Sequence, residues 1–463
     1  MKKSINSIYI SAAHKSSGKT IISIGLSRIL SNLNHDIRTF KKGPDYIDMS
    51  WLTLASKRSS YNLDFNTQSK SEIKSFFNKK KSKINLIEGN KGLYDGISIS
   101  GSDDNSAMSI LTNSPVILVI DTEGITRGIA PLLQGYINFE KRCQITGVIL
   151  NKVKTERHEN KLINAVKNYT DLKILGSLRK NKDLIISERH LGLIPPNENN
   201  IEDKKIELIS KILLDSIEKR EFSKIGINFK KEKKINNDLQ VITTIKKEKL
   251  KIKIGVFYDK SFGFYYKDDI ENLKENGADI IYINSVRNKK LPKVDGLFIG
   301  GGFPEINALD ISKNKNLIAD VKKFIELGGP CYSECGGLMY LSKTIKFRNK
   351  KHKMVGIIPG NIDMSIRPIG RGYVRLNVMK NHLWGIKENT SINAHEFHHA
   401  NMIFEKNAKK IFAYNVKRGH GINGKKDGFQ YKNLLANFSH LRHTKKCQWI
   451  KHYIKFVKEK KHD

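Results

Sequence analysis

A cysteine flanked by glycines could act as a nucleophile in the C-terminal half of this chain. Cys335 follows a segment broken by Gly329-Pro330, and Gly336-Gly337 comes directly after it. This order predicts a strand, a sharp turn and the start of a helix, the backbone that exposes a nucleophile at a strand end. Amides at the start of a helix favour both a thiolate and a developing oxyanion. An unreactive, buried cysteine in a turn is the alternative interpretation.

Two other segments supply the groups that a cysteine nucleophile needs. Residues 294–305 contain an apolar strand that runs into three consecutive glycines, whose amides can approach a bound carbonyl oxygen closely. The predicted oxyanion hole consists of Gly301, Gly302 and Gly336. Residues 434–440 are a short apolar strand that delivers His440, at a separation from Cys335 that is typical of Cys/His pairs. Cys335 is the predicted nucleophile and His440 its base.

A second set of residues, near the N-terminus, could bind phosphate. A strand is predicted at 8–10 and a helix at 21–30, and Ser-Gly-Lys-Thr at 17–20 ends a P-loop pattern between them. In such a loop the backbone amides hold phosphates, the lysine reaches the β- and γ-phosphates and the hydroxyl binds Mg²⁺. Ala12 or Ala13 replaces the first glycine of the pattern. A helix that merely begins with lysine and threonine is the alternative.

Carboxylates follow two further segments and could hold the metal ion of a nucleotide. Asp45 and Asp48 come after a strand that ends in Gly-Pro, and Glu88 ends the strand predicted at 84–88. Mg²⁺ binds few protein carboxylates and takes phosphate oxygens as further ligands. Ordinary turn chemistry is the alternative, because Gly, Asp and Asn are common in turns. The order of these segments behind Gly-Lys-Thr favours the magnesium interpretation.

The elements that position these residues alternate along the chain. Residues 115–121 and 145–153 are near-continuous apolar strands, and helical patterns occur at 124–136 and 158–168. Such strands indicate a parallel sheet covered on both faces, so the predicted fold class is α/β with doubly wound sheets. A charge-dense run that is poor in glycine separates two such patterns. The predicted division is a domain 1–220, a linker 221–250 and a domain 251–463.

Composition excludes several classes of protein. The chain has 463 residues, no apolar run near the ~20 residues of a membrane span and no apolar signal segment. Its four cysteines are too few for a disulfide framework, so we expect a cytoplasmic protein. The formal charge of +37 is spread along the whole chain without a nucleic-acid-binding motif. We therefore expect a solvated, lysine-rich surface and no specific nucleic-acid partner.

His395-Glu-Phe-His-His399 matches the H-E-x-x-H zinc pattern. Zinc proteases need this pattern inside a helix, so that both histidines share one face. The flanking residues here indicate a strand and a loop, and no further ligand lies at a suitable spacing. We do not expect a zinc site.

Seven motifs in order resemble the cobyrinic acid a,c-diamide synthase family, over almost the whole chain. They are GPDYID, IEGNKGLYDG, GVILNKV, ERHLGL, GGGFPE, SECGG and HEFHH. The resemblance implies a dethiobiotin-synthetase-like ATP domain followed by a flavodoxin-like class I glutamine amidotransferase domain. It implies a ligase of cobalamin biosynthesis that amidates the a and c acetates of cobyrinic acid through an acyl phosphate. ATP with Mg²⁺, glutamine and a polycarboxylated tetrapyrrole are the implied partners, and a homodimer is compatible with the resemblance.

The patterns above and the resemblance give roles for single residues, and the roles in substrate binding are implied by the resemblance alone. The expected ATP-binding residues are Ser17, Gly18, Lys19, Thr20 and Asn151, the last toward adenine. The expected metal ligands are Thr20, Asp45 and Glu88, and the expected substrate-binding residues are Tyr46, Asp48 and Asp95. The aromatic segment 262–266 could stack on the macrocycle or serve ordinary packing, and both interpretations are open.

Departures from the family pattern leave alternatives. Arg442 stands where related amidotransferases often carry a glutamate, so we expect a Cys/His dyad in which another group orients His440. The same chemistry on sirohaem or sirohydrochlorin is one alternative function. A non-catalytic P-loop regulator or binding protein is the alternative from another class.

Overall fold

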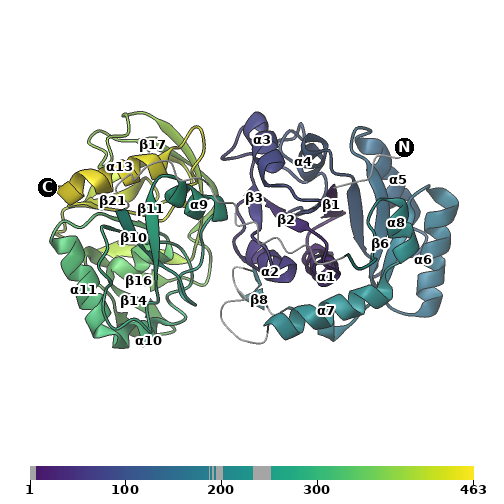
Figure 1. Cartoon of the computed structure of the whole chain (residues 1–463), viewed down its shortest axis with the longest axis horizontal. Helices are drawn as coiled ribbons and strands as arrows, with labels where there is room; N and C mark the ends of the chain where they lie inside the picture. The colour runs from purple at the N-terminus through teal and green to yellow at the C-terminus, as the bar shows by residue number, and fades with distance from the viewer. Residues whose placement is uncertain (1–6, 187, 190–191, 194–201, 233–251, 463) are drawn as a thin grey trace. The chain divides into compact units, whose positions relative to one another are not determined.

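The chain forms two compact units, Met1–Val241 and Ile242–Asp463, in the computed structural model (Figure 1). The structure describes residues 7–186, 188–189, 192–193, 202–232 and 252–462. Each unit contains a β-sheet with helices and has its own hydrophobic core. The predicted α/β fold class is confirmed.

Seven parallel strands form the sheet of the first unit. Their order across the sheet is β3 (Tyr61–Leu63), β2 (Ile37–Lys42), β4 (Ile84–Glu88), β1 (Ser7–Ala12), β5 (Val116–Asp121), β6 (Ile145–Val153) and β7 (Lys173–Arg179). Most strand residues are buried, which explains the continuous apolar runs of the sequence. The carboxyl ends of parallel strands lie at one edge of the sheet, so the loops after β1, β2 and β4 meet there.

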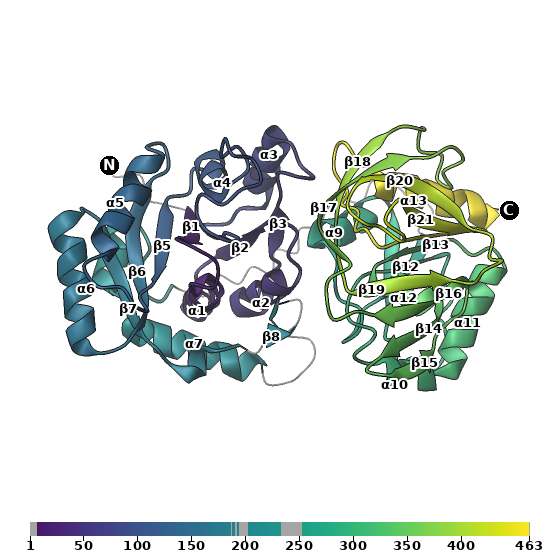
Figure 2. The ribbon, with the colours of Figure 1, turned by 180° about the vertical axis from the view of Figure 1, so that it is seen from behind.

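Helices cover both faces of this sheet (Figures 1 and 2). One layer consists of α1 (Lys19–Asn32), α2 (Ile47–Ser56) and α7 (Glu202–Ser216), which pack against one another. The other layer consists of α3 (Lys70–Lys80), α4 (Asn105–Thr112), α5 (Ile129–Phe139) and α6 (Glu156–Tyr169). The short elements are η1 (Lys182–Leu184), β8 (Glu188–Arg189), β9 (Gly192–Leu193) and α8 (Lys219–Lys224). The ERHLGL motif contributes β8 and β9, and its two central residues lie outside the described residues.

The first unit extends further along the chain than the sequence analysis expected. Phe222 of α8 is fully buried and packs edge-on against Phe229, with 5.3 Å between ring centroids. The amide of Glu232 donates to the carbonyl oxygen of Leu33 at 2.9 Å. Residues 219–232 therefore pack on the first unit through apolar side chains such as Phe222 and Phe229. The linker was predicted to start earlier, at residue 221. The rest of the predicted linker, 233–250, lies outside the described residues.

A nine-stranded mixed sheet organises the second unit. Its order is β11 (Ala278–Ile283), β10 (Ile252–Phe257), β12 (Gly296–Ile299), β13 (Cys331–Glu334), β22 (Leu434–Asn437), β21 (Lys426–Tyr431), β20 (Ile411–Arg418), β17 (Gly370–Val378) and β18 (Ser391–His398). The first five strands are parallel and follow the flavodoxin-like order, as predicted. The remaining four pair antiparallel, which was not predicted.

A smaller sheet and five helices make up the rest of the second unit within its described residues, 252–462. The small sheet has the order β15 (Lys350–Lys353), β14 (Ser342–Phe347), β16 (Ile358–Met364) and β19 (Ala400–Phe404). The helices are α9 (Lys267–Glu275), α10 (Ala308–Lys313), α11 (Lys315–Glu326), α12 (Gly336–Leu341) and α13 (Trp449–His462).

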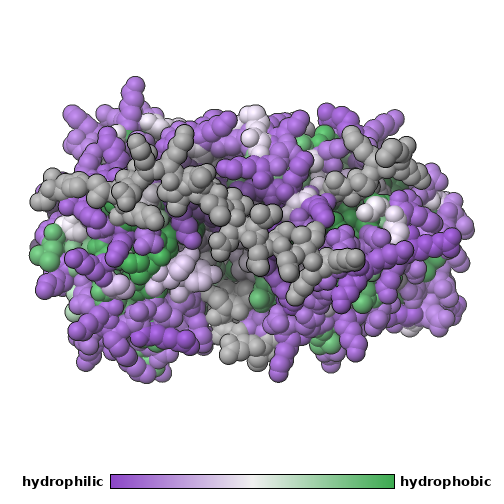
Figure 3. All heavy atoms as spheres, in the orientation of Figure 1, coloured by the Kyte–Doolittle hydropathy of each residue, from purple (hydrophilic) through white to green (hydrophobic). Residues whose placement is uncertain are grey.

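The surface agrees with the lysine-rich composition. Hydrophilic side chains dominate the face drawn in Figure 3. Within the described part of the chain, no helix combines the length and the apolar character that crossing a membrane requires.

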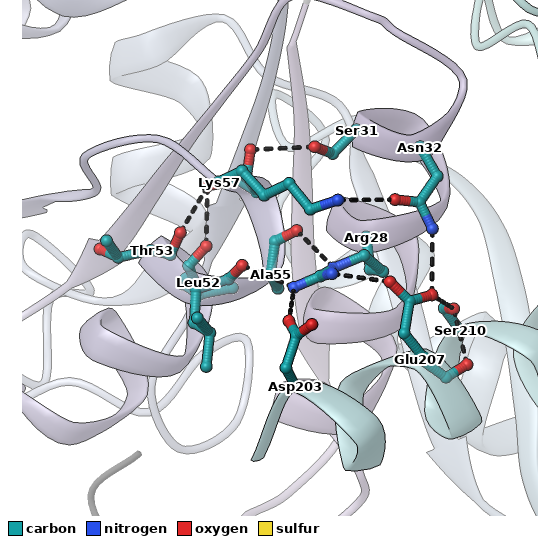
Figure 4. A network of polar contacts seen from close by, with 12 residues as sticks. Arg28, Ser31, Asn32, Leu52, Thr53, Ala55, Lys57, Asp203, Glu207 and Ser210 are labelled. Carbon is teal, nitrogen blue, oxygen red and sulfur yellow. Dashed lines mark hydrogen bonds and ion pairs between the residues drawn. The ribbon is translucent and has the colours of Figure 1, made fainter. Parts of the chain in front are cut away.

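One buried arginine ties three helices of the first unit together (Figure 4). Arg28 of α1 is fully buried, and its guanidinium donates to the carbonyl oxygens of Leu54 and Ala55 at 2.8 and 3.1 Å. The last carbonyls of a helix lack full hydrogen bonding within that helix, so Arg28 supplies donors to two of them, although the Leu54 oxygen also accepts from the Lys57 amide at 3.4 Å. It also donates to Asp203 and Glu207 of α7, both at 2.7 Å. The guanidinium therefore fixes α2 and α7 against α1.

We predict that Arg28→Met lowers the free energy of unfolding of the first unit by about 2 kcal/mol, because four hydrogen bonds are lost and Glu207 keeps only its contacts with Asn32 and Ser210. Hydrogen exchange of α7, followed by mass spectrometry, measures the effect. Asn32→Ala is the control, because Asn32 is more exposed and donates to Glu207 at 3.1 Å. Equal exchange rates of α7 in both variants would contradict the role of Arg28 in fixing α7 against α1.

Candidate active sites

Cys335 lies on a strained turn between a strand and a helix, as the sequence predicts. It follows β13 directly and precedes α12, and its backbone has φ 47° and ψ −103°. A positive φ is uncommon for a residue with a side chain and marks strain that the surrounding structure must hold. The Cys335 amide donates to the carbonyl oxygen of Asn437 at 2.7 Å, which ties the turn to β22. A Cβ atom at Gly337 would lie 2.1 Å from the carbonyl oxygen of Ile299, so the turn requires glycine there.

His440 is held beside this turn by the neighbouring strand. β22 pairs in parallel with β13, with Asn437 opposite Glu334, and His440 follows three residues later. Its Nδ1 atom lies 3.3 Å from Oε2 of Glu334. Burial lowers the pKa of His440, but its interactions with Cys335 and Glu334 outweigh burial and raise the pKa to about 10. The structure thus brings the predicted nucleophile and base together, with the imidazole in its protonated form at neutral pH.

Glu334 is the third member of this site, and sequence reasoning missed it. Its carboxylate accepts a hydrogen bond from the Leu441 amide at 2.8 Å and another from the Tyr332 hydroxyl. These bonds fix the carboxylate facing Nδ1 of His440, the arrangement by which an acidic residue orients a catalytic histidine. The expected dyad is therefore a Cys–His–Glu arrangement. Its only signal in the sequence is the glutamate directly before the nucleophile.

Arg442 has a different task from the glutamate that it replaces. It is fully buried and donates to Oδ2 of Asp268 at 3.1 and 3.2 Å, and its guanidinium lies 4.7 Å from the ring centre of Tyr266. A guanidinium has no acceptor, so it cannot orient an imidazole as a carboxylate does. Arg442 instead supports Tyr266 beneath the site.

The HEFHH motif contributes a ring that packs on the base. The motif lies on β18, in a strand as predicted, and continues to His399. His395 stacks on His440 with 4.8 Å between ring centroids and 14° between planes, and its Nδ1 shares a hydrogen bond of 3.2 Å with the Tyr266 hydroxyl. Burial, together with the charges of His440 and Arg442, lowers the pKa of His395 well below its ordinary value. The neutral imidazole of His395 therefore packs against the protonated imidazole of His440.

The three predicted oxyanion glycines lie close to these groups. A Cβ atom at Gly301 would be 2.4 Å from Cε1 of His440, and one at Gly336 would be 3.0 Å from the Gly302 amide nitrogen. Gly302 has φ +150°, and a Cβ there would lie 2.1 Å from the Ser261 carbonyl oxygen. Glycine is needed at these positions because the backbone approaches its neighbours so closely. Their function as oxyanion donors stays a prediction.

The aromatic segment 262–266 packs inside the second unit. Phe262 is fully buried and contacts Phe257 and Tyr340 edge-on. Tyr265 is also buried, and its hydroxyl accepts a hydrogen bond from the Gly300 amide at 2.8 Å. Of the two open interpretations, the structure supports packing for these rings.

The predicted P-loop connects β1 to α1 in the first unit. Gly18 has φ +98° at the start of α1, and a Cβ atom there would lie 2.2 Å from Nδ2 of Asn151. That Nδ2 donates to the carbonyl oxygen of Ser17 at 2.9 Å, so Asn151 fixes the loop. The expected contact of Asn151 with adenine stays a prediction. Neither Ala12 nor Ala13 has a positive φ, so the backbone conformation at these positions does not require glycine.

Thr20 and Glu88 meet at the carboxyl edge of the sheet. The Thr20 hydroxyl donates to Oε1 of Glu88 at 2.7 Å, and to Oδ2 of Asp48 at 3.4 Å. Lys41 at the end of β2, which sequence reasoning did not single out, donates to the same two carboxylates. Lys19 is buried beside them, and burial and the charge of Lys41 lower its pKa to about 8.

The other predicted residues of the first unit lie around this group. Asp45 accepts a hydrogen bond from the Asp48 amide at 2.9 Å, and burial and the charge of Asp48 raise its pKa to about 7. Tyr46 is buried directly before α2. Asp95 accepts from the Gly92 amide at 2.9 Å. The structure therefore places Asp48, more closely than Asp45, beside Thr20 and Glu88.

The donor atoms fit a magnesium ion that a nucleotide helps to bind. Thr20, Asp48 and Glu88 offer hard oxygen atoms, and Oε2 of Glu88 is buried without a hydrogen-bond partner. Across the described residues, no three His, Cys, Asp or Glu side chains are arranged to hold a metal by themselves. Mg²⁺ commonly binds few protein carboxylates and completes its shell with phosphate and water.

A P-loop on a parallel sheet and a Cys–His–Glu site on a second α/β unit together define an amide ligase with a glutamine amidotransferase domain. Residues 9–194 match the model of the CobQ/CobB/MinD/ParA nucleotide binding domain, and residues 253–446 that of the CobB/CobQ-like glutamine amidotransferase domain. The chain belongs to the family of cobyrinate a,c-diamide synthases, which confirms the resemblance and the prediction of an enzyme.

Three relatives carry that name along nearly their full length. The cobyrinate a,c-diamide synthase of Magnetococcus marinus is 33% identical over 98% of this chain and 97% of its own. That of Caldanaerobacter subterraneus is 35% identical over 96% and 97%. That of Methanobrevibacter smithii is 36% identical over 91% and 92%.

We predict that Glu334→Gln lowers the rate of glutamine hydrolysis about 100-fold, because His440 loses the carboxylate that orients it. Without that negative charge the raised pKa of His440 falls, so the alkaline limit of the activity moves to lower pH. A pH profile of glutaminase activity measures both effects, with Glu326→Gln on the exposed face of α11 as control. An unchanged profile would show that Glu334 does not act on His440.

Proposed function

We propose that this chain amidates the a and c acetate carboxylates of cobyrinic acid, using ATP and glutamine. The observation that carries the proposal is the Cys335–His440–Glu334 arrangement on the unit that matches a glutamine amidotransferase domain. The names of the full-length relatives supply the substrate. No feature of the described residues favours sirohaem or sirohydrochlorin instead.

Glutamine is the proposed source of nitrogen. The Cys335 sulfur attacks the carboxamide carbon while the proton held by His440 goes to the departing nitrogen, which gives ammonia and a γ-glutamyl thioester. Amides of Gly301, Gly302 and Gly336 stabilise the oxyanion of the tetrahedral intermediate. Water then attacks the thioester, releases glutamate and restores the thiol.

Activation of the carboxylate takes place at the P-loop. A substrate carboxylate oxygen attacks the γ-phosphorus of ATP, which forms an acyl phosphate and ADP, and ammonia then displaces phosphate to leave the amide. Lys19 and the loop amides hold the phosphates, and Asp95 and Tyr46 are the residues proposed to position the substrate carboxylate. Thr20, Asp48 and Glu88 would hold Mg²⁺, which would supply positive charge to neutralise the phosphate oxygens.

We predict that Cys335→Ala abolishes amidation with glutamine and spares amidation with free ammonium, because only ammonia production needs the thiolate. Mass spectrometry of the product with each nitrogen source measures this. Cys331→Ala is a matched control: Cys331 is buried four residues earlier, where burial raises the pKa of its thiol. Loss of both activities in Cys335→Ala would refute the proposal that Cys335 serves only the production of ammonia from glutamine.

We predict that Lys19→Ala eliminates amidation with either nitrogen source, because the acyl phosphate is no longer formed. The same assay, with the exposed Lys70→Ala as control, measures this. An unaffected rate would contradict the phosphate-binding role.

The substrate is tested by incubating the enzyme, ATP, Mg²⁺ and glutamine with cobyrinic acid, sirohydrochlorin or sirohaem. Doubly amidated cobyrinic acid is the expected product. Amidation of only a sirohaem-type ring would overturn the substrate and keep the chemistry.

A further inference from the structure

Lys41 donates to both carboxylates at the P-loop edge, as the Thr20 hydroxyl does, and it brings a positive charge to them. Its side chain is buried at the end of β2. Its ammonium lies 2.6 Å from Oδ2 of Asp48, 2.8 Å from Oε1 of Glu88 and 3.4 Å from the carbonyl oxygen of Gly89. The three donors of the ammonium thus point to three oxygens from α2, β4 and the loop after β4.

The neighbouring lysine shows that this arrangement is specific. Lys42 is buried to the same degree and donates to Oδ1 of Asn90 at 3.2 Å. Among the described residues, no carboxylate lies within ion-pair distance of Lys42. Of these two adjacent buried lysines, only Lys41 contacts Asp48 and Glu88, so Lys42 serves as its matched control.

The oxygens around the Lys41 ammonium are those that suit a divalent cation. The Thr20 hydroxyl contacts the same Oε1 of Glu88 and Oδ2 of Asp48 that Lys41 contacts. The second oxygen of Glu88 is buried and has no hydrogen-bond partner. A dication entering here alone would meet a positive charge that already uses both carboxylates, at a separation where like charges repel strongly.

We propose that the Lys41 ammonium holds the place of Mg²⁺ between Asp48, Glu88 and Thr20 until a nucleotide binds, so that the metal enters only together with ATP. This rests on the nucleotide site of the proposed function. The phosphates bring negative oxygens that accept the ammonium, and the flexible four-carbon stem of lysine lets it turn toward them. The two carboxylates are then free for the metal, and neither state leaves buried charges unpaired.

Binding of Mn²⁺ in place of Mg²⁺, followed by electron paramagnetic resonance of the free ion, tests this exchange. Without nucleotide, Lys41→Met should bind Mn²⁺ at least about tenfold more tightly than the wild type, because the competing charge is gone. Lys42→Met should stay within about twofold of the wild type, because Lys42 has no contact with the carboxylates. No tightening in Lys41→Met, or equal tightening in Lys42→Met, would overturn the proposal.

A second arm separates this inference from the proposed function. Addition of a non-hydrolysable ATP analogue should tighten Mn²⁺ binding by the wild type, and absence of this effect would contradict the nucleotide site itself. If the analogue tightens Mn²⁺ binding by the wild type, but Lys41→Met binds Mn²⁺ without nucleotide no more tightly than the wild type does, only the role of Lys41 is overturned.

Thermal unfolding keeps the test decisive if Lys41→Met folds poorly. Mg²⁺ should raise the unfolding midpoint of Lys41→Met and Lys41→Gln more than that of the wild type, at equal ionic strength. Equal shifts in all three proteins would overturn the proposal.

Discussion

Compensation of buried charge is the constraint on which both sites depend. At the carboxyl edge of the parallel strands of each sheet, buried side chains carry charges, and an isolated buried charge is costly. In the second unit, His440 and Glu334 compensate each other beside Cys335. In the first unit, Lys41 compensates Asp48 and Glu88. The reactive groups are thus held in place by the same interactions that keep the folded chain free of unpaired charge.

The parallel sheets supply the geometry in which such compensation is possible. Adjacent strands end at one edge, so residues far apart in the sequence become neighbours without long loops. Glu334 and Asn437 face each other across β13 and β22, and Lys41 and Glu88 across β2 and β4. The helices that pack on the first sheet must be held in place if the carboxyl edge of that sheet is to keep its geometry. Arg28 contributes to this by joining α1, α2 and α7.

Much of this arrangement could be predicted from local patterns, because strands, turns and glycines leave local signals. The turn at Cys335, the loop ending in Lys19-Thr20 and the strand before His440 are confirmed. Partners set by tertiary packing were missed. Nothing local distinguishes Lys41 from Lys42, and an orienting glutamate was sought two residues after His440, whereas Glu334 reaches it from another strand. The HEFHH motif supported the family resemblance, but the stacking of His395 on His440 was not predicted, because stacking between strands has no sequence signature.

The close approach of Gly301 to His440 has a consequence for how this enzyme can change. With 2.4 Å between a hypothetical Cβ and the ring, any side chain at 301 would displace the base while every reactive atom remained in the sequence. One nucleotide change could therefore convert a glutamine-dependent enzyme into one that draws on free ammonium. Such a lineage would keep Cys335, His440 and Glu334 intact, and inspection of those residues alone would mistake it for a working amidotransferase.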